Sequence, residues 1–187
     1  LQRLEVVSVT LDQDRDEPQL VFESMNSTGL DLETSDLVRN YMLMGCSMAE
    51  QKTLYEDYWL PMERVLGNLS FDAFLHDWMV VTLKKPVLKG RVMYAEFKRF
   101  AADSSLLRME RTRNLLANML EYAKYYAAIK GVAAAGSGDM NVDRRLESIQ
   151  KLVSTVTDPL VMDMFAAWKH ERITRDLSLI HISEPTR

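Results

Sequence analysis

Four polar residues that could take part in chemistry lie within one short stretch, LVFESMNSTGLDLETSDLVRN, at residues 20–40. They are Glu23, Asn26, Asp36 and Arg39, whose carboxylate, amide and guanidinium groups can hold a charged ligand or shape a loop. The spacing of these residues allows three interpretations, which differ in what the side chains contact.

In the first interpretation, the stretch is the end of a helix. Asn26 and Gly29 tolerate a positive φ better than other residues, so they can form the turn that ends it. Phe22 then lies in the core and Glu23 in solvent. The residues would have a structural role only.

In the second interpretation, the stretch binds an anion. Backbone N–H groups after Gly29 and at the start of the next helix could face a phosphate. The acidic residues Asp31, Glu33 and Asp36 oppose this unless a cation or Arg39 offsets their charge. An anion site therefore requires a positive group close by.

The third interpretation is a polar network in which Glu23, Asn26, Asp36 and Arg39 hold a loop or ligand from another segment. Asp36 and Arg39 are three residues apart on one predicted helix, where a local pair contributes only ~0.2–0.5 kcal/mol. The spacing leaves all three interpretations open.

The stretch resembles the GmrSD family of modification-dependent (type IV) restriction endonucleases, at the end of their ParB-like N-terminal domain. That family shows the pattern Phe-Glu-x-x-Asn-x-x-Gly-x-x-Leu-x-x-x-Asp-Leu-x-Arg-Asn. It falls without a gap on Phe22, Glu23, Asn26, Gly29, Leu32, Asp36, Leu37, Arg39 and Asn40. Residues 54–63 and 92–100 are also similar to the family. The resemblance covers residues 3–130 well and 140–176 more loosely.

This resemblance implies an intact protein that hydrolyses a nucleoside triphosphate with Mg and cleaves modified foreign DNA. Its nucleotide motif, Asp-Gly-Gln-Gln-Arg, would precede Leu1, and its HNH nuclease domain would follow Asp176. We therefore expect an internal fragment that joins the two and is itself inactive. A second copy of the same chain, in a homo-oligomer, is another partner that we consider. The alternative is a non-enzymatic helical protein-interaction module with a ParB-like end.

The family pattern implies nucleotide-binding roles for Glu23, Asn26, Gly29, Asp36 and Arg39 and no catalytic residue in this chain. Asn26 and Arg39 would shape the nucleotide pocket, with Arg39 offsetting phosphate charge. Glu23 would position a partner from the missing motif. The competing view is that Asp36 and Arg39 only support the turn.

The elements that must position these residues are mainly helical. We expect one N-terminal strand at residues 3–11, left from a truncated ParB-like α/β domain and followed by a multi-helix array. Its partner strands would lie upstream. Thr34 or Ser35 should cap the helix that follows Gly29, and Pro61 should kink or restart a later one. The expected helices are 18–25, 35–44, 48–66, 70–83, 91–102, 105–130, 142–155 and 158–172.

Three domains follow from this pattern. Residues 1–45 end the ParB-like nucleotide domain, and residues 46–176 form a helical domain. Residues 177–187, LSLIHISEPTR, match the translation of a common transposon-based sequencing adapter along their whole length. We expect this tail not to be native.

Two surface features could contact DNA. Aromatic residues between positions 54 and 78 could stack on bases, but their helical spacing favours a packed core. The basic segment 84–91, KKPVLKGR, could contact a DNA backbone, although a solvated loop is the stronger interpretation.

Composition excludes several classes of site. The net charge of −4 gives no basic footprint for nucleic acid. The three histidines have no metal-binding spacing, and the single cysteine, Cys46, cannot form an internal disulfide. We therefore expect no metal site, a reducing cytoplasmic setting and no membrane span.

Overall fold

The computed structural model describes residues 32–44, 46–102, 108–132, 138–150 and 157–174. The chain divides into two compact units, Leu1–Leu32 and Glu33–Arg187, and everything below concerns the second. Several predictions lie outside the described residues: the strand at 3–11, the helix at 18–25, the roles of Glu23, Asn26 and Gly29, and the tail 177–187.

The described residues are helical and contain no strand, which confirms the mainly α prediction for that part of the chain. α3, η1 and α4 run on without a break, so they form one long helix. The elements are α2 (Thr34–Leu43), α3 (Met48–Leu54), the π-turn η1 (Tyr55–Trp59), α4 (Leu60–Leu66), α5 (Phe71–Leu83), α6 (Arg91–Ala102), α7 (Arg108–Ile129), α8 (Met140–Gln150) and α9 (Asp158–Lys169).

The periodic spacing of apolar residues in the sequence predicted the positions of these helices well. The predicted segments 91–102 and 70–83 differ from α6 and α5 by one residue at most. α2 begins at Thr34 and belongs to the compact unit that starts at Glu33, so it groups with the helices after it. None of the described helices is both long and apolar enough to cross a membrane.

Pro61 lies in the first turn of α4, as expected of a proline at which a helix restarts. Just before it the chain forms a π-turn, in which the Leu60 N–H donates to the Tyr55 carbonyl five residues earlier. A proline inside a helix lacks an N–H and clashes with the carbonyl of the preceding turn. The wider π-turn just before Pro61 accommodates it, and the helix continues to Leu66.

The start of α2 is capped from a distance, and the prediction of a Thr34 or Ser35 cap is wrong. The N-cap residue is Glu33, whose side chain makes no capping hydrogen bond. The Asp72 carboxylate accepts the Thr34 N–H at 3.0 Å and the Ser35 N–H at 2.7 Å. Asp72 lies in the first turn of α5, so this contact ties α2 to α5.

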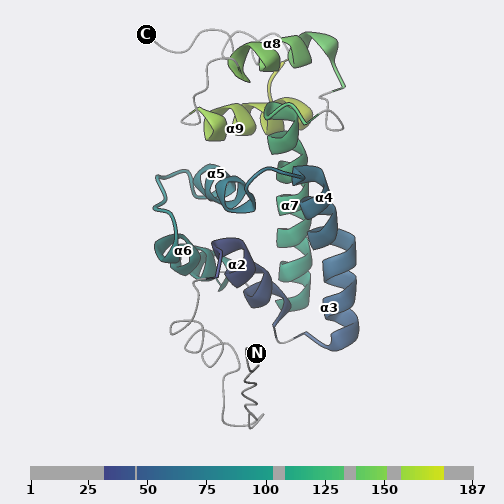
Figure 1. Ribbon diagram of the computed structural model, residues 1–187, viewed down its shortest axis with the longest axis vertical. Coiled ribbons are helices and arrows are strands. Elements are labelled where there is room, and N and C mark those ends of the chain that lie inside the picture. The colour runs from purple at the N-terminus through teal and green to yellow at the C-terminus, as the bar shows by residue number, and fades with distance from the viewer. Residues whose placement is uncertain (1–31, 45, 103–107, 133–137, 151–156, 175–187) are drawn as a thin grey trace, which may run out of the picture. The chain divides into compact units, whose positions relative to one another are not determined.

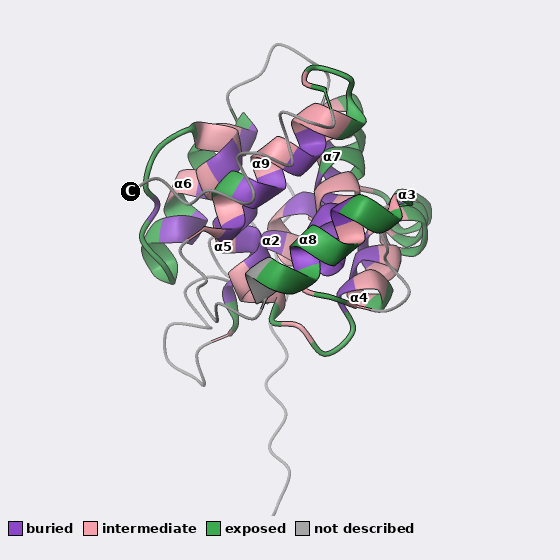
Figure 2. Ribbon diagram, turned by 90° about the horizontal axis from the view of Figure 1, so that it is seen from above, coloured by how far each residue is buried: buried purple, intermediate pink, exposed green. Residues whose placement is uncertain are grey.

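The core lies around α7, which packs against α4 and α9, while α5 packs against α9 and α2 against α6 (Figure 1). Viewed along the molecule, the buried faces of these helices turn toward one another (Figure 2). Trp59, Phe74 and Trp78 are fully buried, which confirms the core interpretation of these aromatic residues. The Trp59 ring stacks on Phe71 with centroids 4.7 Å apart.

Candidate functional site

Asp36 and Arg39, the two predicted site residues that the structure describes, form an ion pair along α2. Arg39 Nη2 donates to Asp36 Oδ1 at 2.7 Å. Arg39 Nη1 also lies 3.5 Å from Glu63 Oε1 on α4. The guanidinium therefore faces two carboxylates, one on its own helix and one on a neighbour.

Glu63 is the centre of this cluster. It accepts a hydrogen bond from Trp59 Nε1 at 2.9 Å and one from the Tyr55 hydroxyl at 3.3 Å. The guanidinium carbon of Arg39 lies 6.0 Å from the centroid of the Trp59 ring. The cluster thus joins α2 to the π-turn and α4, and each of its polar groups has a protein partner.

Sequence reasoning did not single out Glu63. The available signal was its position four residues after Trp59 and eight after Tyr55, which places all three on one helical face. The contact with Arg39 carried no comparable signal, because it joins two different helices. Asp36 and Arg39 contact each other and Glu63, while Glu23 and Asn26, the other members of the predicted network, lie outside the described residues.

The start of α2 bears on the anion interpretation. Two of the N–H groups that could face a phosphate are already bound to Asp72. A carboxylate at a helix N-terminus satisfies the free N–H groups and interacts favourably with the helix dipole. The negative group bound at the start of α2 is therefore the Asp72 carboxylate of the same chain.

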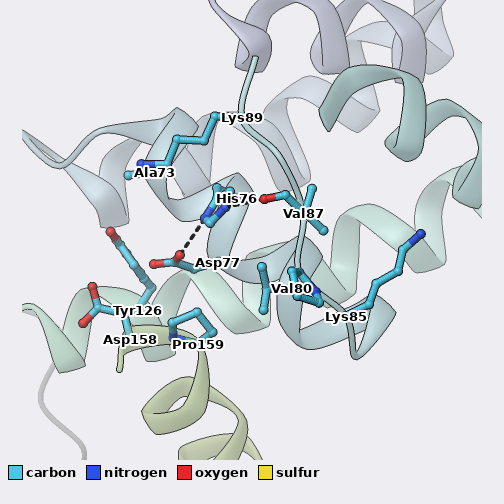
Figure 3. A pocket seen from close by; sticks show the side chains of 11 residues that line it. Ala73, His76, Asp77, Val80, Lys85, Val87, Lys89, Tyr126, Asp158 and Pro159 are labelled. Atoms are coloured by element: carbon cyan, nitrogen blue, oxygen red, sulfur yellow. Dashed lines mark hydrogen bonds and ion pairs between the residues drawn. The ribbon is translucent and has the colours of Figure 1, made fainter. Parts of the chain in front are cut away.

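A second group of polar side chains lines a cavity of about 660 Å³. The cavity lies between α5, the segment 84–90, α7 and the start of α9 (Figure 3). Its walls mix apolar and ionisable residues: Ala73, His76, Asp77, Val80, Lys85, Pro86, Val87, Lys89, Tyr126, Asp158 and Pro159.

His76 connects the segment 84–90 to α5. Its Nε2 lies 3.0 Å from the Val87 carbonyl oxygen, and its Nδ1 lies 2.9 Å from Asp77 Oδ1. A carbonyl can only accept, so Nε2 carries a proton. One further proton must lie in the contact between Nδ1 and Asp77, either on the imidazole or on the carboxyl. In both arrangements the His76–Asp77 pair is neutral overall.

Two more groups approach Asp77 from other helices. Asp158, at the start of α9, is buried and paired with Lys130. Tyr126, on α7, is also buried. Burial is the main cause that raises the pKa of Asp77, and Asp158 adds to it while the hydrogen bond to His76 acts in the opposite direction. Burial and the two carboxylates raise the pKa of Tyr126 far above its ordinary range.

The cavity has hydrogen-bonding capacity but no metal-binding geometry. Across the described ranges, no group of three or more histidine, cysteine or acidic side chains is arranged to hold a metal ion. The sequence did not predict this site, because its polar residues come from positions between 76 and 158 and share no motif.

In the basic segment, residues 84–90 form a loop in which every residue except Val87 is exposed to solvent. Lys84 Nζ lies 2.6 Å from Asp163 on α9, and Lys85 Nζ lies 2.8 Å from Glu96 on α6. These two lysines therefore have carboxylate partners within the chain, and their charge is offset locally.

Comparisons with known proteins found no match: no family model, no curated protein and no solved structure is similar enough to this chain to report.

Proposed function

We propose that the chain is part of a GmrSD-like restriction endonuclease that uses a nucleoside triphosphate with Mg to act on modified foreign DNA in the cytoplasm. In this proposal residues 1–45 end the nucleotide domain and residues 46–176 connect it to an HNH nuclease domain. The support is the uninterrupted Phe-Glu to Arg-Asn pattern at residues 22–40. The proposal predicts that this chain alone has neither nuclease nor nucleotidase activity.

One structural observation carries the mechanical part of this proposal. α2 holds the last part of the pattern, Asp36, Leu37, Arg39 and Asn40, and is fixed to the helices after it at two points. Asp72 of α5 binds the start of α2, and Glu63 of α4 faces Arg39. A change in the nucleotide domain that moves α2 would therefore also move α4 and α5.

The nucleotide-binding roles of Glu23, Asn26, Gly29, Asp36 and Arg39 belong to the same proposal. The Arg39 side chain is 31% exposed, so part of the guanidinium is open to a phosphate from outside the helical unit. Its pairing with Asp36 and Glu63 favours a coupling role, in which Arg39 fixes α2 while nucleotide contacts come from the residues before it.

The test uses the intact gene, recovered by sequencing the locus across both ends of this chain. Cells that carry it are challenged with a phage whose DNA contains modified bases and with the same phage grown unmodified. The proposal predicts plating reduced by several orders of magnitude for the modified phage alone. Equal plating of the two phages, with no nucleotide-dependent cleavage of modified DNA by the purified protein, would favour the interaction module instead.

Arg39→Ala in the intact protein separates the two roles of this residue, with Arg64→Ala as the control. Arg64 is an exposed arginine on α4. A coupling role predicts a lower melting temperature for Arg39→Ala, and nucleotide hydrolysis that persists but no longer drives DNA cleavage. A direct phosphate contact predicts lost hydrolysis with unchanged melting.

A further inference from the structure

We propose that the cavity between α5, the segment 84–90, α7 and the start of α9 binds a small molecule with an amidinium, guanidinium or similar multi-N–H cationic group on an apolar body. This goes beyond the proposed function, which requires no pocket at this place. Four features of the cavity carry the proposal: a free carboxylate oxygen, a free hydroxyl, the balance of charge, and the walls.

The carboxylate oxygen belongs to Asp77, whose side chain is only 10% exposed. Its Oδ1 faces His76 Nδ1 at 2.9 Å, while its Oδ2 has no hydrogen-bond partner among the described residues. Oδ2 is an acceptor whether the shared proton sits on His76 or on Oδ1. A buried acceptor without a partner is unfavourable, so a donor from outside the chain would stabilise it.

The hydroxyl belongs to Tyr126, which is 3% exposed and lines the same cavity. Within the part of the chain that the structure describes, it makes no hydrogen bond. Its ring is fixed by Phe74, at a centroid distance of 5.6 Å, and by Lys130, whose Nζ lies 5.4 Å from the ring centroid. Figure 3 shows the Tyr126 side chain close to those of Asp77 and Asp158. Asp77 and Tyr126 line the same cavity, so a ligand that reaches Asp77 also lies beside Tyr126.

The lysines nearest the cavity have carboxylate partners that offset their charge. Lys130 is paired with Asp158, and Lys85 lies 2.8 Å from Glu96. Lys89 is exposed to solvent, where its charge is screened. The His76–Asp77 pair is neutral overall and keeps Oδ2 as a free acceptor. N–H donors with positive charge fit such a site better than neutral or anionic groups.

The walls and size fit an apolar body. Val80, Pro86, Val87 and Pro159 supply hydrocarbon surface from three different segments. A cavity of about 660 Å³ falls within the range of ~300–1,000 Å³ that is typical of small-molecule sites. A flat ring could lie against these walls while its amidinium reaches the buried oxygen of Asp77.

The test compares benzamidine with benzamide, which has nearly the same shape but no charge. Titration calorimetry on the whole chain should give saturable binding of benzamidine at one site, and benzamide should bind at least about tenfold more weakly. Asp77→Asn should weaken benzamidine binding by about tenfold or more, because a neutral amide oxygen is a weaker acceptor for an amidinium than a carboxylate oxygen. Asp57→Asn, an exposed aspartate in the π-turn, should leave it unchanged.

Tyr126→Phe keeps the proposal testable if Asp77→Asn does not fold, because it removes only the hydroxyl oxygen. It should weaken benzamidine binding a few-fold and leave the circular dichroism spectrum unchanged. Equal affinity for benzamide, unchanged affinity in the folded variants at Asp77 or Tyr126, or no saturable binding would each overturn the proposal. None of these outcomes depends on the phage plating experiment, so the two proposals fail independently.

Discussion

The α2–α4 contact and the cavity beside α5 contain similar residues in different states. At the contact, Arg39 faces Asp36 and Glu63, and Glu63 also accepts from Trp59 and Tyr55. At the cavity, Asp77 has one oxygen without a partner and Tyr126 has a buried hydroxyl without one, within the described residues. The first region satisfies its polar groups internally, whereas the second leaves capacity for something else.

This difference suggests how structural and binding clusters can be told apart from their hydrogen-bond partners. Buried polar groups in folded proteins nearly always have partners, because an unsatisfied one costs about 1–3 kcal/mol. A complete set of partners therefore indicates a structural role. An incomplete set beside an open cavity indicates a site that a ligand completes.

The largest expected effect comes from breaking the long-range cap of α2. Asp72→Ala leaves the Thr34 and Ser35 N–H groups without their acceptor. We expect a loss of about 1–3 kcal/mol in the free energy of unfolding, measured by urea denaturation. Asp57→Ala, which removes an exposed aspartate, should change it by less than about 0.5 kcal/mol. Equal effects of the two substitutions would mean that the cap adds no stability.

A smaller effect is expected for the ion pair between α2 and α4. A double-mutant cycle of Arg39→Ala and Glu63→Ala should give a coupling energy of about 0.5–1 kcal/mol, because both side chains are about one-third exposed. The coupling should fall at high salt. A coupling energy near zero, measured by urea denaturation at low salt, would mean that Glu63 does not help to fix α2.

The smallest expected effect is the change with pH of the stability that Asp77 contributes. Its pKa is raised above the ordinary 3.8, so the folded state holds this proton more tightly than the unfolded state. The stability that this proton contributes is present below pH 3.8 and lost as the pH rises through the folded pKa. The Asp77→Asn variant has no titrating carboxyl at this position, so it does not lose stability in this way. Its side-chain amide N–H can still donate to His76.

We therefore expect Asp77→Asn to gain stability relative to the unsubstituted protein as the pH rises from 4 toward 7. Thermal melts across this range measure the difference. The control, Asp57→Asn, should give a difference that stays flat with pH. A relative stability of Asp77→Asn that falls with rising pH would contradict the burial argument.

The fold was predictable where the pattern is local. Periodic apolar residues placed α5 and α6 within one residue, and the same spacing put Trp59, Phe74 and Trp78 in the core. The π-turn before Pro61 was not predicted, because no local signal in the sequence distinguishes it from an ordinary helical turn.

The sites were less predictable because their contacts are long-range. The cap of α2 joins residues 38 positions apart, and the cavity gathers side chains from positions 73 to 159. Asp36–Arg39 was found because both partners lie on one helix, while Glu63 needed the packing of α2 on α4. Pairing across helices depends on tertiary structure, which neither residue type nor spacing specifies.

The most direct test of the comparison is an NMR titration of the whole chain with benzamidine, followed through the backbone amides. We predict saturable chemical-shift changes at His76, Asp77 and Val87 around the cavity, and none at Arg39 and Glu63, where the polar groups already have partners. Changes centred on Glu63, or shifts that spread evenly and never saturate, would contradict the account.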